Sequence, residues 1–118
     1  MDMVNIVTEF GMGTSLRRGD YTEAAARGIR DALWHNSINA AELFGFDKED
    51  MQIRVDIGAQ QPEAVDLDRL AEIFPYGQPE FYVTKGGIDT PRPEGVGNPT
   101  VQVVVALTVS FDMERADD

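Results

Sequence analysis

The stretch TVQVVVALTVSFDM, residues 100–113, decides the fold of this chain. Every second residue from Val101 to Phe111 is apolar, which is the pattern of a β-strand with one buried face. The opposite face carries Val104 and Ala106 among polar residues, so it is only half polar. A sheet whose second face is partly apolar needs a cover on that side, and so short a chain has no spare element to provide it. We therefore expect another subunit to cover this face.

The remaining hydrophobic pattern places further strands and helices before that strand. Period-2 alternation predicts strands, and apolar residues at helical spacing after a capping residue predict helices. In the first strand, this alternation puts Val4 and Phe10 on the same face. We expect, in chain order, a strand over 3–10 that ends at Gly11, a helix over 21–35, a short helical segment that begins after Asn39 and stops at Gly45, a strand over 51–59, a short helix after Asp66, a short strand over 80–85 and the strand over 100–113.

This order of elements predicts a single α/β domain over 1–118, a two-layer sandwich. Its sheet should be mixed and roughly four-stranded, and right-handed crossovers should place the two main helices on one face. The opposite face is then left for oligomerisation. We expect 113–118 to be a frayed tail. Because 86–99 is rich in glycine and proline, we expect no regular structure there and interpret it as a functional loop or a flexible arm.

The charge and composition exclude several classes of function. The chain has 118 residues, of which 21 are acidic and 10 are basic, and its formal net charge is −11. Such a surface repels nucleic acid and anionic membranes, because binding to both depends on lysine and arginine. The absence of cysteine excludes disulfides, thiolate zinc sites, iron–sulfur clusters and cysteine nucleophiles. No stretch has the pattern of a signal peptide or a membrane span, so we expect a cytoplasmic protein.

Positive charge is concentrated in one connection, GMGTSLRRGD over 11–20. Arg17 and Arg18 come just before a helix start, where unpaired backbone N–H groups also favour negative charge. Together with Gly13 and Ser15, they would supply donors to a small anion. The alternative, in which both arginines are solvated or paired with carboxylates, is equally open.

The two glycines of this connection do not complete a dinucleotide-binding motif. The third glycine of that fingerprint would fall at Leu16, and two glycines alone are a weak signal. We interpret Gly11 and Gly13 as residues that permit a tight turn.

Ser15 is a candidate nucleophile, but a serine needs an activating base. The chain's single histidine, His35, should lie about 20 Å away at the far end of the first helix. Lys85 is the remaining candidate base. Asp20 is better explained as a helix cap, and the other carboxylates lack the spacing of a calcium loop. We therefore expect no metal and no cofactor.

Several of these stretches, taken together, resemble the Lin family, a set of conserved hypothetical proteins without an assigned function. They are EFGMGTSLRRGDYTEAAARGIRDAL, IGAQQPEAVDLDRLAEIFPYG, VTKGGI and GVGNPTVQVVVA. The family's opening reads FGMG, any residue, Asp, any residue, His, Gly, any residue, Asp. Here Ser15 and Arg17 stand in the places of that Asp and His, Arg18 replaces the Gly, and Asp20 is kept.

The resemblance implies an α/β domain that assembles through its sheets. In its fold, the family is distantly similar to the repeated units of ring-opening amidohydrolases and to trimeric chorismate-mutase-like proteins, whose pockets lie between repeats or subunits. The two replacements remove the side chains that are best suited to proton transfer or metal binding.

Two functions are consistent with these observations. The first is a homo-oligomer, a trimer or a multiple of it, that binds a small anionic or imide-like molecule at a subunit interface and could hydrolyse or isomerise it. Gly13, Ser15, Arg17 and Arg18 would contact the ligand, and Lys85 would come from the same or a neighbouring chain. The second is a non-catalytic subunit, either homo-oligomeric or paired with a paralogue that retains the Asp and His.

Overall fold

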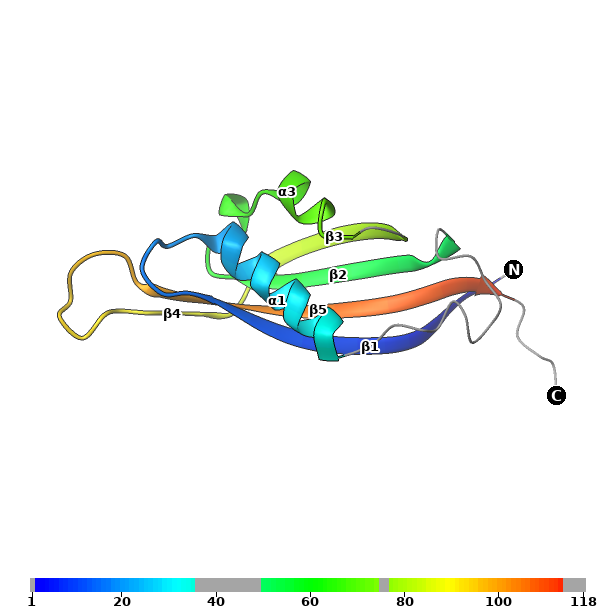
Figure 1. The fold of residues 1–118 in the computed structure, drawn as a ribbon, viewed down its shortest axis with the longest axis horizontal. Helices are drawn as coiled ribbons and strands as arrows, with labels where there is room; N and C mark the ends of the chain where they lie inside the picture. The colour runs from blue at the N-terminus through cyan, green and yellow to red at the C-terminus, as the bar shows by residue number, and fades with distance from the viewer. Residues whose placement is uncertain (1, 36–49, 75–76, 114–118) are drawn as a thin grey trace.

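The structure, a computed structural model, describes residues 2–35, 50–74 and 77–113. These ranges form a sheet with helices packed on one face, as Figure 1 shows. We call the face toward the helices the inner face and the opposite one the outer face. The two-layer α/β arrangement predicted from the sequence is therefore present.

Among the described residues, the sheet has five strands in the order β1-β5-β2-β3, with β4 beside β5 and off this path. β1 (Asp2–Ser15) and β2 (Gln52–Ala59) lie antiparallel on the two sides of β5 (Thr100–Met113). β3 (Gln78–Lys85) pairs in parallel with β2, and the short β4 (Ile88–Thr90) pairs antiparallel with β5. The sheet is mixed, as expected, and its strand count exceeds the rough estimate by the short β4.

In the part of the chain that the structure describes, two α-helices cover the inner face. α1 (Tyr21–His35) lies across β1 and β5 (Figure 1), and α3 (Leu67–Ala71) follows the 3-10 turn η2 (Pro62–Ala64) and contacts α1. The short helical segment expected after Asn39 lies outside the described residues. Within the described ranges, the structure has no helix with the length and apolar character needed to cross a membrane.

Two aspartates start these helices, as the sequence predicted. The Oδ1 of Asp20 accepts a hydrogen bond from the backbone N–H of Glu23 at 2.9 Å, three residues into α1. The Oδ1 of Asp66 accepts from the N–H groups of Asp68 and Arg69 at the start of α3, at 3.1 and 3.4 Å. Each carboxylate pairs backbone donors that the first turn of a helix leaves without a partner.

The core lies between α1 and the inner face. The predicted apolar face of β5 is at most 2 % exposed, and it is formed by Val101, Val103, Val105, Leu107, Val109 and Phe111. Ile29 of α1 and Leu70 of α3 are fully buried in the same hydrophobic core. Burial of each such side chain stabilises the fold by about 1.5–3 kcal/mol, so this strip holds the helices to the sheet.

The expectation that the first strand ends at Gly11 and that the glycines form a tight turn is wrong. β1 continues to Ser15, and Gly11 and Gly13 pair in the ladder with β5. The glycines are there because the backbone of α1 crosses them closely. A Cβ added at Gly11 would lie 2.2 Å from the carbonyl oxygen of Gly28, and one at Gly13 would lie 1.8 Å from that of Ala24.

The predicted alternation in the first strand is also wrong, because the register of β1 shifts between Asn5 and Val7. Val4 pairs with Phe111 on the inner face, whereas Phe10 lies on the outer face and is 70 % exposed. A bulge inserts one extra residue, and with a side-chain period of two this moves every later side chain to the other face.

Residues 86–99 form an arm that was expected to have no regular structure, and this expectation is wrong for β4. The last pair between β2 and β5 is Gly58 with Val104. β4 pairs with the same edge of β5 from Gln102 to Thr100. The free backbone groups of β5 beyond the end of β2 are thus paired by β4. Residues 91–99 are irregular, as expected.

Candidate functional site

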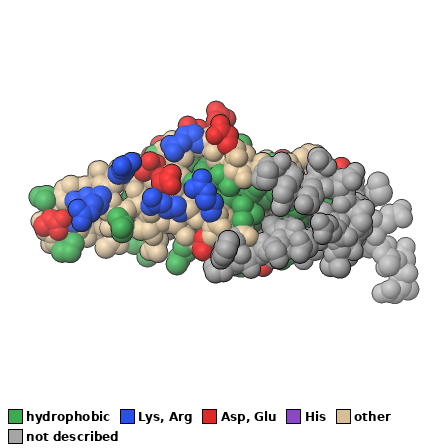
Figure 2. All heavy atoms as spheres, viewed as in Figure 1, with side chains coloured by type: hydrophobic (Ala, Val, Ile, Leu, Met, Phe, Trp, Pro, Cys, Tyr) green, Lys and Arg blue, Asp and Glu red, His purple; other side chains and the backbone are tan. Residues whose placement is uncertain are grey.

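A hollow rich in arginine lies at the N-terminal end of α1. Its volume is about 540 Å³, and it is formed by the end of β1, the turn that follows, the first two turns of α1, and α3. Figure 2 shows basic side chains gathered over this part of the molecule, with acidic side chains between them. We call it the arginine hollow. It is lined by Ser15, Leu16, Arg17, Arg18, Asp20, Glu23, Arg27 and Arg69.

Four arginines and two carboxylates give the arginine hollow a formal charge of +2, in a chain whose net charge is −11. Glu23 is shared between several arginines, among them Arg27 at 3.3 Å and Arg69 at 3.9 Å. Arg17 and Arg18 are exposed, and neither forms an ion pair within the part of the chain that the structure describes. The positive charges of these two side chains are therefore not neutralised by an ion pair within the described residues.

Ser15 serves the local structure of the hollow. It is only 4 % exposed, and its Oγ accepts a hydrogen bond from the backbone N–H of Asp20 at 3.2 Å. This bond closes the turn that carries the two free arginines. Arg27 also ties α1 to the end of β1, because its Nη1 donates to the carbonyl oxygen of Thr14 at 2.5 Å.

The other two predicted contact residues lie elsewhere. Gly13 lies beneath α1, pressed against the backbone of Ala24, and does not line the arginine hollow. Lys85 lines a separate hollow of about 310 Å³ on the outer face, together with Phe10, Val104 and other residues of the sheet. Within one chain, the structure therefore brings Ser15, Arg17 and Arg18 together and leaves Lys85 at a different site.

The outer face changes from polar to apolar along the strands, because the register aligns its side chains in rows. One row contains Asn5, Ser110, Gln52 and Gln78. A row toward the other end contains Met12, Val104, Gly58 and Thr84. In the apolar part, exposure reaches 70 % for Phe10, 57 % for Met12 and 60 % for Ile88. Since large apolar side chains gather here, this part resembles a contact surface more than a solvated one.

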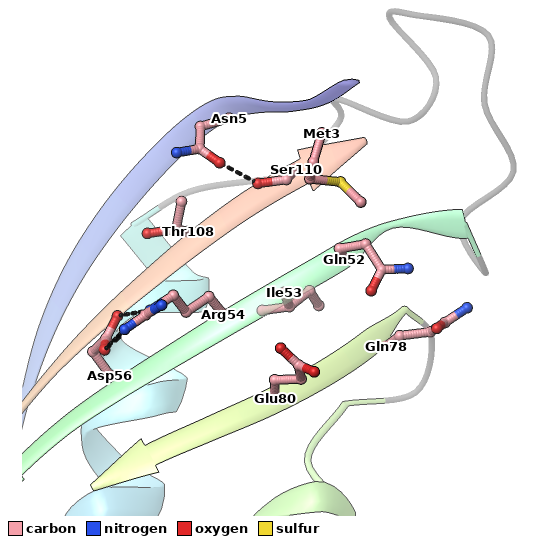
Figure 3. Close-up of a pocket in the computed structure, with 10 residues that line it drawn as sticks. All are labelled: Met3, Asn5, Gln52, Ile53, Arg54, Asp56, Gln78, Glu80, Thr108 and Ser110. Carbon is pink, nitrogen blue, oxygen red and sulfur yellow. Dashed lines mark hydrogen bonds and ion pairs between the residues drawn. The ribbon is translucent and has the colours of Figure 1, made fainter. Parts of the chain in front are cut away.

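The polar part of the outer face forms a second hollow of about 500 Å³, shown in Figure 3. Most of its polar groups are already paired within the sheet. Ser110 donates to the Oδ1 of Asn5 at 2.5 Å, and Arg54 binds both carboxylate oxygens of Asp56 at 3.0 to 3.2 Å. The guanidinium of Arg54 also lies 4.1 Å from the ring centre of Tyr82. This hollow is therefore a satisfied polar surface that offers little free binding capacity.

Comparison with known proteins identifies the family. A family model described as "Conserved hypothetical protein (Lin0512_fam)" matches residues 5–109. The chain belongs to the Lin0512 family. The resemblance to the Lin family noted in the sequence is confirmed. A comparison with curated proteins found no match to this chain.

A solved structure shares the fold of the Lin0512 protein. It is the crystal structure of an FtsZ-like protein of unknown function from Nostoc punctiforme, with 26 % sequence identity and a TM-score of 0.82. The match covers 96 % of this chain and 99 % of the other. The near-complete coverage on both sides indicates that the two proteins share the whole arrangement of sheet and helices.

The sequence analysis of the Lin0512 protein missed two of the four arginines in the hollow. Arg27 follows Glu23 by four residues, which is the spacing of an ion pair on one helix face. This spacing could have placed Arg27 beside Glu23, in the first two turns of the helix that Arg17 precedes. Arg69 comes from α3, and only the packing of α3 against α1 brings it to the hollow. Within the described ranges, no group of three or more His, Asp or Glu side chains could hold a metal ion.

A buried tyrosine was also missed. Tyr21, the first residue of α1, is 6 % exposed, and its hydroxyl donates to the Oδ2 of Asp89 on β4. Burial, and then this bond to a carboxylate, raise the pKa of Tyr21 to about 12. The pair joins α1 to the arm.

Proposed function

We propose that this Lin0512 protein binds a small anionic molecule in the arginine hollow and assembles through its outer face. The observation that carries the proposal is the pair of exposed, unpaired arginines, Arg17 and Arg18, in a hollow of net positive charge. Elsewhere the chain has a large excess of acidic residues, so an anion is attracted to few other places.

The chemistry of the hollow favours planar or tetrahedral oxyanions. A guanidinium group presents donors in a fixed fork that matches a carboxylate or a phosphate. The carbonyl oxygens of an imide are weaker acceptors for the same donors. Arg27 and Arg69 already share Glu23, so Arg17 and Arg18 are the side chains that we expect to contact the ligand first. If the bound molecule is hydrolysed or isomerised, these arginines would stabilise developing negative charge.

Assembly through the outer face is supported by its apolar part and by its charge. Phe10 and Val104 are exposed at 70 % and 40 %. The charged residues that line the two outer-face hollows are Arg54, Lys85, Asp56 and Glu80, whose formal charges cancel. Two copies of a chain with charge −11 repel each other least where the local charge is zero. A second copy is thus the cover that we propose for this face, in a trimer or a multiple of it.

The anion proposal can be tested by thermal shift with phosphate, citrate and succinimide. We expect phosphate or citrate to raise the melting temperature, and Arg17→Ala to weaken the apparent affinity by about tenfold, since a hydrogen bond to a charged group contributes about 1.5 kcal/mol or more. Arg30→Ala is the matched control: Arg30 is an exposed arginine of α1 that pairs with Glu23 but does not line the hollow. Equal affinity in Arg17→Ala and the parent protein would contradict the proposal.

The alternative is a non-catalytic subunit that pairs with a paralogue. It is favoured by the same exposed residues of the outer face, Phe10, Met12 and Val104, and by Ser15 and Arg17 in the places of the family's Asp and His. Co-expression with a family member that carries Asp and His, followed by size-exclusion chromatography, separates the two. A mixed complex that forms in preference to the homo-oligomer would favour the paralogue.

A further inference from the structure

The arm over 86–99 contacts the turn that carries the free arginines. The Nη2 of Arg92 and the Nδ2 of Asn98 both donate to the carbonyl oxygen of Arg17, at 3.1 and 3.3 Å. Thr100, at the start of β5, donates through its Oγ1 to the carbonyl oxygen of the preceding residue, Leu16, at 3.4 Å. Two side chains from a distant part of the chain thus hold one peptide group of the arginine hollow.

The two donors are themselves held in place. The side chain of Arg92 is 24 % exposed, compared with 53 % to 60 % for the other arginines in ion pairs, and its Nη1 lies 3.8 Å from Glu94. Asn98 packs against the turn, because a Cβ added at Gly19 would meet its Cγ at 3.3 Å. An arginine so much more buried than the others is typical of a structural contact rather than a solvated charge.

Holding the carbonyl of Arg17 fixes the direction of the next amide. In a trans peptide the C=O and N–H groups point in opposite directions, and the described chain contains no cis peptide bond. With the carbonyl of Arg17 turned toward the arm, the N–H of Arg18 points away from it. The arm therefore sets the orientation of the backbone from which both free arginine side chains project.

We propose that Arg92 and Asn98 are positioning residues of the anion site, which act through Arg17 and not by contact with the ligand. This inference rests on the proposed function of the arginine hollow. If the arm positions Arg17 for the anion, then binding of the anion must in turn stabilise the docked arm, because coupling between two sites is reciprocal.

The test is a double-mutant cycle with inorganic phosphate and citrate as probes. We expect Asn98→Ala to weaken binding about three- to tenfold, the range for the loss of one hydrogen bond. In an Arg17→Ala background, the same change should have a clearly smaller effect, because only Arg18 is left for the arm to position. Val96→Ala is the matched control, since Val96 is an exposed arm residue, 68 % accessible, that does not reach the turn.

The outcomes separate the two proposals. If Arg17→Ala does not weaken binding, the anion site itself is wrong, and the positioning role is overturned with it. If Arg17→Ala weakens binding but Asn98→Ala does not, the anion site stands and the positioning role is overturned. Equal losses from Asn98→Ala in both backgrounds would also overturn it, because they would show an effect independent of Arg17.

A second measurement follows the arm directly. We expect saturating phosphate to slow hydrogen exchange over 88–100 in the parent protein and in Val96→Ala, but not in Arg17→Ala. If phosphate binds but leaves hydrogen exchange in the arm unchanged, the reciprocal coupling is absent. That result would contradict the positioning role.

Discussion

Substitution of Gly13 by alanine tests the close packing of α1 on β1. The new Cβ would lie 1.8 Å from the carbonyl oxygen of Ala24 and 2.5 Å from the nitrogen of Gly28, whereas ordinary contact begins at 3.4 Å. The helix backbone must therefore move by up to 1.6 Å, the difference between 3.4 and 1.8 Å. Both clashing atoms belong to the main chain, so no side-chain rotation can relieve the overlap.

We expect Gly13→Ala to lower the free energy of unfolding by about 3 kcal/mol, the upper end of the range for an overpacked core. For a domain of this size, the melting temperature should fall by about 12 °C. Circular dichroism during heating and urea titration measures both quantities. The control is Gly95→Ala: no atom lies within 4 Å of the added Cβ, and the positive φ of +73° predicts a loss of about 1 kcal/mol. A loss in Gly13→Ala no larger than that in Gly95→Ala would refute the packing argument.

Two further predictions concern the outer face and the arm. Val104→Asp should convert the oligomer to a monomer in light scattering, because the proposed interface would then bury an unpaired charge. The control Val96→Asp, on the exposed arm, should leave the mass unchanged. A monomeric parent protein would contradict assembly. In the folded state the pKa of Tyr21 is raised from 10.0 to about 12, so folding favours the protonated phenol. The contribution of Tyr21 to the free energy of unfolding should therefore be fully present below pH 10 and be lost as the pH rises toward 12. Tyr21→Phe should remove part of that loss in urea titrations and Tyr82→Phe should not; an identical pH dependence in all three proteins would count against the buried bond to Asp89.

The parts of the fold that sequence analysis predicted depend on local patterns. The alternation in β5 and the caps Asp20 and Asp66 involve residues close together in the chain, and each has a direct physical signature. The same holds for Arg17 and Arg18, which are adjacent and precede a helix start. Their presence in a positive hollow follows from that position.

The parts that the sequence analysis missed depend on contacts between distant residues. A glycine needed for a turn and one needed for a close helix crossing look alike in sequence, and only the position of α1 distinguishes them at Gly13. The bulge between Asn5 and Val7 leaves no mark in the composition, yet it moves Phe10 to the outer face. Arg69 reaches the hollow from α3, and Asn98 binds the backbone of Arg17 from the arm. No local spacing relates either residue to Arg17.

The central place of β5 in the sheet has a consequence for the order of folding. β1 and β2 do not pair with each other, and each pairs with β5, which comes after the other strands of the described chain. The hydroxyl groups of Thr8 and Thr108, which meet in the finished sheet, are separated by 100 positions in the chain. Before β5 is made, β1 lacks the strand that it pairs with, and α1 can pack mainly on β1. Of the strand pairs in the sheet, only β2 with β3 can form early. Folding should therefore be slow and dominated by long-range contacts, and the nascent chain should be most prone to aggregate just before β5 emerges.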